Sequence, residues 1–207
     1  MRIIRINDAN YPFLLKQINN PPKQLYVYGN SIDFNQKMVT VIGTSNPSSK
    51  GRKEAVKITQ QLVKRGYTII TGITQGIDEI VHKTTLENNG KVLVVLPGDV
   101  KKIKGEKHAK RINYVLENNG NIITEYSCFE EILPQNYLAL NRILCGLSKS
   151  LIIIEAGMIS GTAASAQFAL EENREIYAVI GSLKSTKKVG TNFWIKQGAK
   201  PIISALL

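Results

Sequence analysis

Three loops of this sequence combine glycine with hydroxyl side chains, a composition that suits phosphate binding. They span residues 43–51, 71–78 and 155–162, and each follows a short run of β-branched residues. In an open α/β sheet such loops gather beyond the carboxyl ends of the strands, where helix N-termini present free N–H groups and positive dipole ends. The three loops together predict a phosphate-binding edge, although each glycine can equally be required by its own turn.

The groups that could act as acids or bases are few. Asp78 and His82 are four residues apart, so on a helix they share one face and could relay a proton. The simpler interpretation is a helix-capping Asp and a half-buried, hydrogen-bonded His. Glu125 and Glu155 each end a predicted strand and could perform general acid–base catalysis. Alternatively, they accept hydrogen bonds from loop N–H groups and hold the loops in shape, which is the interpretation we favour.

Familiar catalytic and cofactor motifs are missing from the sequence. No G-x-G-x-x-G follows the first predicted strand of the repeating pattern, no G-K-[ST] occurs, and no G-x-S-x-G elbow is present. Cys128 and Cys145, even with His82 and His108, are too few for a disulfide framework or a complete zinc site. We therefore predict a protein without enzymatic activity, metal or cofactor. The N-terminus lacks a signal-peptide core, so we expect a reduced, cytoplasmic chain.

The charge of the 207-residue chain is unusual in its size and distribution. Lys and Arg number 27 against 16 Asp and Glu, a net charge of +11. Residues 41–112 carry +8 and residues 113–180 carry −5. A lysine-rich genome would explain the total, but the segregation favours a polyanionic partner such as nucleic acid. The apolar runs are far shorter than the ~20 residues that cross a bilayer, so we expect no membrane partner.

The elements that must position these loops follow a regular alternation from residue 38 onward. Apolar β-branched runs predict strands at 39–42, 67–70, 92–96, 122–123, 151–154, 176–179 and 201–203. Between them, amphipathic segments predict helices from Ser48 or Ser49 to about residue 65, and at 77–89, 107–119, 137–147, 162–173 and 191–197. Asn-Asn-Gly ends two of them, because Asn and Gly tolerate the left-handed conformation.

This alternation predicts an α/β fold, with a doubly wound, mostly parallel sheet and helices on both faces. Residues 1–37 have no clear period, so we expect a short N-terminal segment packed on a core domain of residues 38–207.

The motifs of the chain, taken in order over about 190 residues, resemble the DprA (Smf) family of DNA-processing proteins. The matching stretches are Tyr11-Pro12, Pro21-Pro22, Leu25 to Gly29, Val41 to Thr44, Ser48, Gly51, Gly72, Gly76-Ile77-Asp78, His82, Asn141 to Ser148, Glu155-Ala156, Ser160-Gly161-Thr162, Gly190-Thr191-Asn192 and Gly198-Ala199. The resemblance implies an extended Rossmann-like domain that binds single-stranded DNA, forms a homodimer and hands the strand to a RecA-type recombinase during DNA uptake or recombination. Proteins of this kind are binders and loaders rather than enzymes.

Three positions depart from the family pattern, which typically has cations there. They hold Ser45 after the first glycine turn, Gln75 before the Gly-Ile-Asp motif, and Leu140 before Asn141-Arg142. Either DNA binding is weak, or neighbouring cations replace the missing ones; the candidates are Lys50, Arg52, Lys53, Lys101, Lys102, Lys104 and Lys107.

The resemblance and the loops together give a predicted DNA- or phosphate-binding set. Loop N–H groups and helix N-termini would hold backbone phosphates, with nearby cations neutralising them. The predicted residues are Gly43, Thr44, Ser45, Ser48, Lys50, Arg52, Lys53, Gly72, Gln75, Gly76, Asn141, Arg142, Ser160, Gly161 and Thr162, with Lys101, Lys102 and Lys104 as additional cations.

Two alternatives to DNA binding stay open at this point. The chain could be a nucleotide-binding sensor or a nucleotide hydrolase of the same broader Rossmann-like superfamily. Glu125, Glu155 and Ser160-Gly161-Thr162 would then contact a ribose and a phosphate. It could also be a degenerate paralogue that acts only through protein contacts. Tyr137 and Phe193 are aromatic candidates for base stacking, whereas Trp194 and Cys145 are expected in the core.

Overall fold

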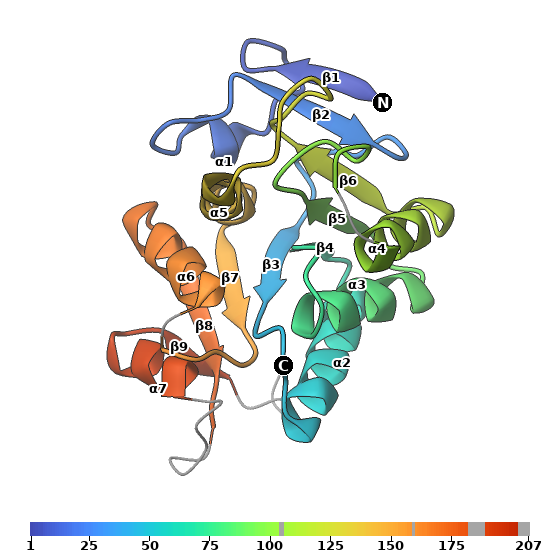
Figure 1. Ribbon diagram of the computed structural model, residues 1–207. Helices are drawn as coiled ribbons and strands as arrows, with labels where there is room; N and C mark the ends of the chain where they lie inside the picture. Colours follow the sequence, from blue (N-terminus) through green and yellow to red (C-terminus); the bar gives the residue numbers. More distant parts are fainter. Residues whose placement is uncertain (104–105, 159, 182–188, 203–207) are drawn as a thin grey trace.

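The computed structural model describes residues 1–103, 106–158, 160–181 and 189–202 (Figure 1). The described residues form one nine-stranded sheet with the strand order β1-β2-β6-β5-β4-β3-β7-β8-β9. The strands are β1 (Arg2–Arg5), β2 (Gln24–Tyr28), β3 (Met38–Ile42), β4 (Thr68–Thr71), β5 (Val92–Val95), β6 (Asn121–Thr124), β7 (Ser150–Ile153), β8 (Glu175–Val179) and β9 (Lys200–Ile202). The helices are α1 (Phe13–Lys16), α2 (Ser49–Lys64), α3 (Ile77–Glu87), α4 (Glu106–Glu117), α5 (Pro134–Gly146), α6 (Gly161–Glu171) and α7 (Val189–Lys196).

The sheet is doubly wound about β3, which confirms the predicted fold class. From β3 the chain builds β4, β5 and β6 on one side and then returns to place β7, β8 and β9 on the other. β3 pairs in parallel with both neighbours, Val39 opposite Ile69 and Val41 opposite Ile152. The direction of chain winding thus reverses between the paired strands β3 and β7, and the carboxyl ends of these two strands mark the topological switch point, where open α/β sheets bind ligands.

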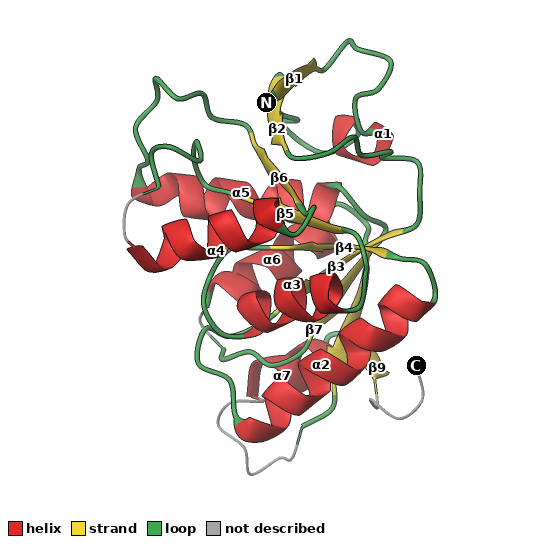
Figure 2. Cartoon of the chain, turned by 90° about the vertical axis from the view of Figure 1, so that its right-hand side faces the viewer, coloured by secondary structure: helices red, strands yellow, loops and turns green. Residues whose placement is uncertain are grey.

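The strands are apolar on both faces because each face is covered by helices. Val92 and Val94 of β5 pack in the cluster with α4, whereas Leu93 and Val95 pack in the cluster with α5. Helices α2, α3 and α4 cover one face, and α1, α5, α6 and α7 cover the other (Figures 1 and 2). This two-sided burial is typical of parallel sheets.

The N-terminal segment contributes two strands that its sequence did not reveal. β1 and β2 pair antiparallel with each other, and β2 continues the sheet by pairing antiparallel with β6, Val27 opposite Ile123. These strands are four and five residues long, too short to show a period within a proline-containing stretch. The domain boundary at residue 38 stays a prediction.

Local signals placed most helix ends correctly. Ser48 caps α2 by accepting a hydrogen bond from the Gly51 N–H. Asn89 and Asn119, which follow α3 and α4, have φ of 56° and 64°, the left-handed conformation that the Asn-Asn-Gly signal predicts. Helix α5 begins at Pro134, earlier than predicted, because the fixed φ of proline suits a first helical turn. Ile203, the last residue of the final predicted strand, lies outside the described residues.

Two further expectations concern the core and membranes. Cys145 and Trp194 are buried, as predicted. Within the described part of the chain, no helix has the length and apolar character that a membrane crossing requires.

Candidate functional site

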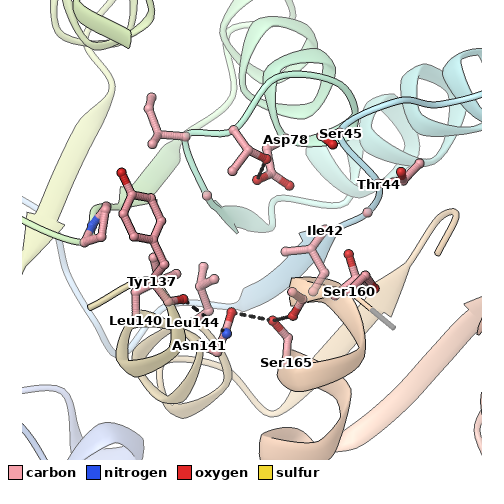
Figure 3. Close-up of a pocket in the computed structure, with 17 residues that line it drawn as sticks. Ile42, Thr44, Ser45, Asp78, Tyr137, Leu140, Asn141, Leu144, Ser160 and Ser165 are labelled. Atoms are coloured by element: carbon pink, nitrogen blue, oxygen red, sulfur yellow. Dashed lines mark hydrogen bonds between the residues drawn. The ribbon is translucent and has the colours of Figure 1, made fainter. Parts of the chain in front are cut away.

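A cavity of about 250 Å³ lies at the switch point, beyond the carboxyl ends of β3 and β4 (Figure 3). We call it the carboxyl-edge cavity. Its walls come from the loops that follow β3, β4 and β5, from the first turn of α3, from α5, and from the N-terminal part of α6. The lining residues are Ile42, Gly43, Thr44, Ser45, Gly72, Ile73, Thr74, Asp78, Pro97, Tyr137, Leu140, Asn141, Leu144, Ser160, Gly161, Thr162 and Ser165.

Backbone hydrogen bonds join the loops into one continuous rim. The Thr44 N–H donates to the Glu155 carbonyl at 2.7 Å, and the Ile77 N–H donates to the Thr44 carbonyl at 3.1 Å. The loop after β3 is thereby tied both to the loop after β7 and to the start of α3. Because these bonds fix the backbone, the rim is preorganised rather than assembled by a ligand.

The side chain of Glu155 anchors the loop after β3 through its hydrogen bonds to Ser48. Its side chain is fully buried, and its two carboxylate oxygens accept hydrogen bonds of 2.8 Å from the Ser48 N–H and the Ser48 hydroxyl. A Cβ at Gly51 would collide with the same carboxylate, so glycine is needed there for space. This geometry supports the loop-holding interpretation of Glu155 over general acid–base catalysis.

Glycines of the first two loops are required by the packing of the loops against neighbouring residues. A Cβ at Gly72 would lie 2.6 Å from Asp78 Oδ2, and one at Gly43 would lie 2.6 Å from Ile77 Cγ1. Gly76 has φ of +88°, and its Cβ would lie 2.5 Å from the Thr44 carbonyl oxygen. These glycines thus have a structural cause that is independent of any phosphate, whereas Gly157 and Gly161 of the third loop have no atom within 4 Å of a Cβ.

Asp78 is the one charged side chain among the described residues that line the carboxyl-edge cavity. It lies in the first turn of α3, is 6% exposed, and accepts a 2.6 Å hydrogen bond from the Thr74 hydroxyl. Burial raises the pKa of Asp78 to about 6, an effect that the hydrogen bonds from Thr74 and Gly43 and the charge of Arg111 only partly oppose. The described lining of the cavity therefore offers no cation to attract a phosphate.

His82, one turn beyond Asp78, differs from both sequence interpretations. Its ring is fully buried, and neither ring nitrogen has a hydrogen-bond partner within the described residues. Burial lowers the pKa of His82 to about 4, so the ring is neutral at physiological pH. Since Asp78 bonds to Thr74 instead, these described residues form no Asp78–His82 proton relay.

The remaining walls of the cavity are apolar, with a few amides and hydroxyls. Tyr137 is 47% exposed, and Leu140 and Leu144 lie beside it on α5. Asn141 is buried and accepts a 2.8 Å hydrogen bond from the Ser165 hydroxyl, which joins α5 to α6. Such a cavity suits a flat, largely uncharged group better than a free phosphate.

The structure brings eight of the fifteen predicted site residues together at this cavity and distributes the rest. The eight are Gly43, Thr44, Ser45, Gly72, Asn141, Ser160, Gly161 and Thr162. Ser48 caps α2, and Gly76 packs against Ser45 beside an exposed Gln75. Lys50, Arg52 and Lys53 are exposed on α2, and Lys101 and Lys102 are exposed after β5. Lys104 lies outside the described residues, and nothing is described for the side chain of Lys107. The binding role of the whole set stays a prediction.

Arg142 lies away from the cavity, in a bidentate ion pair. Its two terminal nitrogens donate to the carboxylate of Glu125 at 2.7 and 2.6 Å, and its Nε donates to the Asn20 carbonyl at 3.0 Å. The pair is 11% and 15% exposed and connects α5 to β6 and to the N-terminal segment. Arg142 and Glu125 thus neutralise each other's charge, and this pairing could not be predicted from their separation of 17 residues.

The apolar lining of the carboxyl-edge cavity was also not predicted from the sequence. The small residues of α6 and Tyr137 were the signals that could have indicated it.

Three comparisons with known proteins agree on one family. The family described as DNA recombination-mediator protein A matches residues 2–206 of this chain. Protein Smf of Escherichia coli (strain K12) is 32% identical over 197 residues, which cover 95% of this chain and 53% of Smf. This chain therefore spans about half the length of that relative.

Two solved structures share the fold over nearly the whole chain. The X-ray structure of DNA processing protein A (DprA) from Streptococcus pneumoniae matches with a TM-score of 0.89 and 31% identity, covering 97% of this chain and 70% of that one. The structure of DNA processing protein A from Helicobacter pylori, which gives insights into its single-stranded DNA binding mode, matches with a TM-score of 0.85 and 25% identity. It covers 97% of this chain and 94% of that one.

Proposed function

This chain belongs to the DNA recombination-mediator protein A family, and from that premise we propose that it binds single-stranded DNA at the carboxyl-edge cavity. In this proposal the protein covers the strand, passes it to a RecA-type recombinase, and acts as a homodimer without catalysing a reaction. The support is a preformed rim of three loops at the switch point, in a fold shared with a relative whose structure concerns its single-stranded DNA binding mode.

The chemistry of the cavity suits a base better than a phosphate. Tyr137 offers a half-exposed ring beside Leu140, and bases of any kind stack on such rings. Thr44, Ser45 and Thr162 supply hydroxyls that can bind a sugar or a base edge. Since stacking tolerates every base, we expect binding with little sequence preference.

Binding of a labelled oligo-dT, followed by fluorescence anisotropy over a salt series, tests the proposal. Tyr137→Ala should weaken binding by about 5- to 150-fold, since stacking of a base on an aromatic ring contributes about 1–3 kcal/mol. Phe13→Ala is the matched control, because Phe13 is 66% exposed on α1, away from the cavity lining. An oligo-dT affinity that does not change with salt concentration, or equal weakening in both variants, would contradict the proposal.

The transfer of the strand to a recombinase needs its own measurement. A RecA-type recombinase hydrolyses ATP on single-stranded DNA, and this chain should shorten the lag before hydrolysis begins. Tyr137→Ala should lose that effect together with DNA binding. Persistence of the lag with wild-type protein, while oligonucleotide binding is intact, would limit the function to strand binding.

A nucleotide sensor is the second candidate, and one observation favours it. The described cavity lining has a single charged group, the carboxyl of Asp78, and the cavity volume of about 250 Å³ is close to the lower end of small-molecule pockets. A carboxylate at that position could accept a hydrogen bond from a base amino group. Thermal-shift screening with mononucleotides separates the candidates: stabilisation by a mononucleotide without oligonucleotide binding would favour the sensor.

A further inference from the structure

The outward face of α2 carries four lysines on one line. Lys50, Lys53, Lys57 and Lys64 are spaced three, four and seven residues apart, so they project from the same side of the helix. All four are exposed. At a rise of about 1.5 Å per residue they span about 21 Å along the helix axis. We call this set the α2 lysine stripe.

Helix α2 contributes one carboxylate against the four lysines of the stripe. This acid, Glu54, is 7% exposed and its Oε1 lies 3.8 Å from Lys50 Nζ. Arg52 and Arg65 are exposed on the same helix and its C-cap. A shallow hollow of about 400 Å³ lies beside two of the stripe lysines, and it is lined by Arg52, Lys53, Val56, Lys57, Gln60 and Ile80.

This surface differs in charge from the carboxyl-edge cavity. The described lining of the hollow includes three cations and no acid, whereas the described cavity lining includes one acid and no cation. Two cations elsewhere are already engaged, because Arg142 is paired with Glu125 and Arg111 with Glu79. A strand that places a base in the cavity therefore has to find neutralising groups for its phosphates outside it.

The stripe begins where the cavity rim ends. Ser48, which closes the loop after β3, is the N-cap of α2, and Lys50 follows two residues later. Helix α2 then runs away from the rim on the side of the sheet that Figure 2 turns toward the viewer. The stripe thus starts close in sequence to the loop after β3, which contributes Gly43, Thr44 and Ser45 to the cavity.

We propose that the α2 lysine stripe binds the phosphate backbone of a single DNA strand whose base enters the carboxyl-edge cavity. This inference rests on the proposed function and adds where the backbone lies. Lysine ammonium groups on flexible stems neutralise phosphates without reading sequence. The apolar floor of Val56 and Ile80 fits the stems of the lysines and the sugars between phosphates.

The test replaces three stripe lysines by glutamine: Lys53→Gln, Lys57→Gln and Lys64→Gln together. Each phosphate of a single strand that the protein neutralises adds about 0.7 to the steepness of log K against log salt, so removal of three cations should reduce the slope by about 2. At 0.1 M salt this corresponds to about 100-fold weaker binding of oligo-dT. Lys50 is kept because it is partly paired with Glu54.

The matched control removes the same charge elsewhere, at exposed positions on α1, before β2 and on α7: Lys16→Gln, Lys23→Gln and Lys196→Gln. Its slope should equal that of the wild type, and both triple variants should keep the wild-type unfolding temperature. An equal fall in the two triple variants would overturn the inference, because net charge rather than the stripe would then act.

The remaining outcomes separate this inference from the proposed function. If wild-type protein binds no oligonucleotide, both fail. If wild-type protein binds and the stripe variant keeps its slope, the stripe inference alone fails. If the stripe variant loses binding to phosphatidylserine vesicles that the wild-type protein shows, and its oligonucleotide binding is unchanged, the stripe would bind a membrane surface and the inference would be overturned as well.

Discussion

Replacement of Glu155 by glutamine tests the view that this side chain holds the cavity rim in place. The carboxylate is fully buried and accepts two hydrogen bonds of 2.8 Å, both from Ser48. Glutamine has nearly the same shape, but its amide carries only one acceptor oxygen, and an NH2 group takes the place of the second. That NH2 group faces a donor, so one buried donor of Ser48 is left without its partner.

The expected cost follows from the type of bond that is removed. A hydrogen bond to a charged group contributes about 1.5–3 kcal/mol, and a buried donor left without a partner costs a similar amount. We therefore expect Glu155→Gln to lower the free energy of unfolding by about 2 kcal/mol. For a chain of this size that corresponds to a fall of about 4–8 °C in the unfolding temperature.

The assay is thermal and urea unfolding, with Glu171→Gln as the control at an exposed carboxylate on α6. Ser48→Ala completes a double-mutant cycle, and the two decreases in stability should be less than additive because both substitutions affect the hydrogen bond between the Ser48 hydroxyl and Glu155. Oligonucleotide binding should weaken as well, since the loop after β3 is no longer anchored. A fall below about 1 °C in Glu155→Gln, or fully additive decreases, would refute the reasoning.

Two further predictions concern the glycines and the buried titratable groups. Gly72→Ala should destabilise the fold by about 1–3 kcal/mol, because its Cβ would lie 2.6 Å from Asp78 Oδ2, whereas Gly161→Ala, with no atom within 4 Å of its Cβ, should not; equal unfolding temperatures would contradict this. The pKa of His82 is about 4 in the folded protein against 6.5 in the unfolded chain, so the unfolded chain protonates first on acidification. The free energy of unfolding that His82 contributes therefore falls as the pH falls from 6.5 to 4. The raised pKa of Asp78, about 6 against 3.8, has the opposite sign, so its stability contribution rises as the pH falls from 6 to 3.8. Each effect is about 3 kcal/mol, so the two nearly cancel in the wild-type protein. Urea unfolding between about pH 7 and pH 4 should therefore show that His82→Leu gains stability on acidification, whereas Asp78→Asn loses stability.

The fold could be predicted from the sequence because its signals are local. Alternation of β-branched runs with amphipathic segments identifies the strands and helices of the core, and each of these signals spans only about ten residues. Asn89 and Asn119 mark helix ends because their side chains tolerate the left-handed backbone conformation. The alternation predicted a doubly wound, mostly parallel sheet, but the strand order and the switch point are known only from the structure. The N-terminal strands were missed, because pairing with β6 rather than any intrinsic pattern makes them strands.

The candidate site was only partly predictable for a related reason. Chain order places the loops at one edge of the sheet, so eight predicted residues meet at the cavity. Which charges remain available there depends on partners from distant segments. Arg142 is engaged by Glu125 across 17 residues, and Glu155 by Ser48 across 107 residues.

The sequence by itself therefore determined the doubly wound sheet, the position of the loops and the family motifs, all of which depend on residue types at short spacing. Only the tertiary structure decided that the described cavity lining holds a carboxyl and no cation, that His82 is buried without a hydrogen bond to any described residue, and that the exposed lysines lie along α2. The physical reason is that backbone conformation is set by neighbours in the chain, whereas burial and charge pairing are set by neighbours in space.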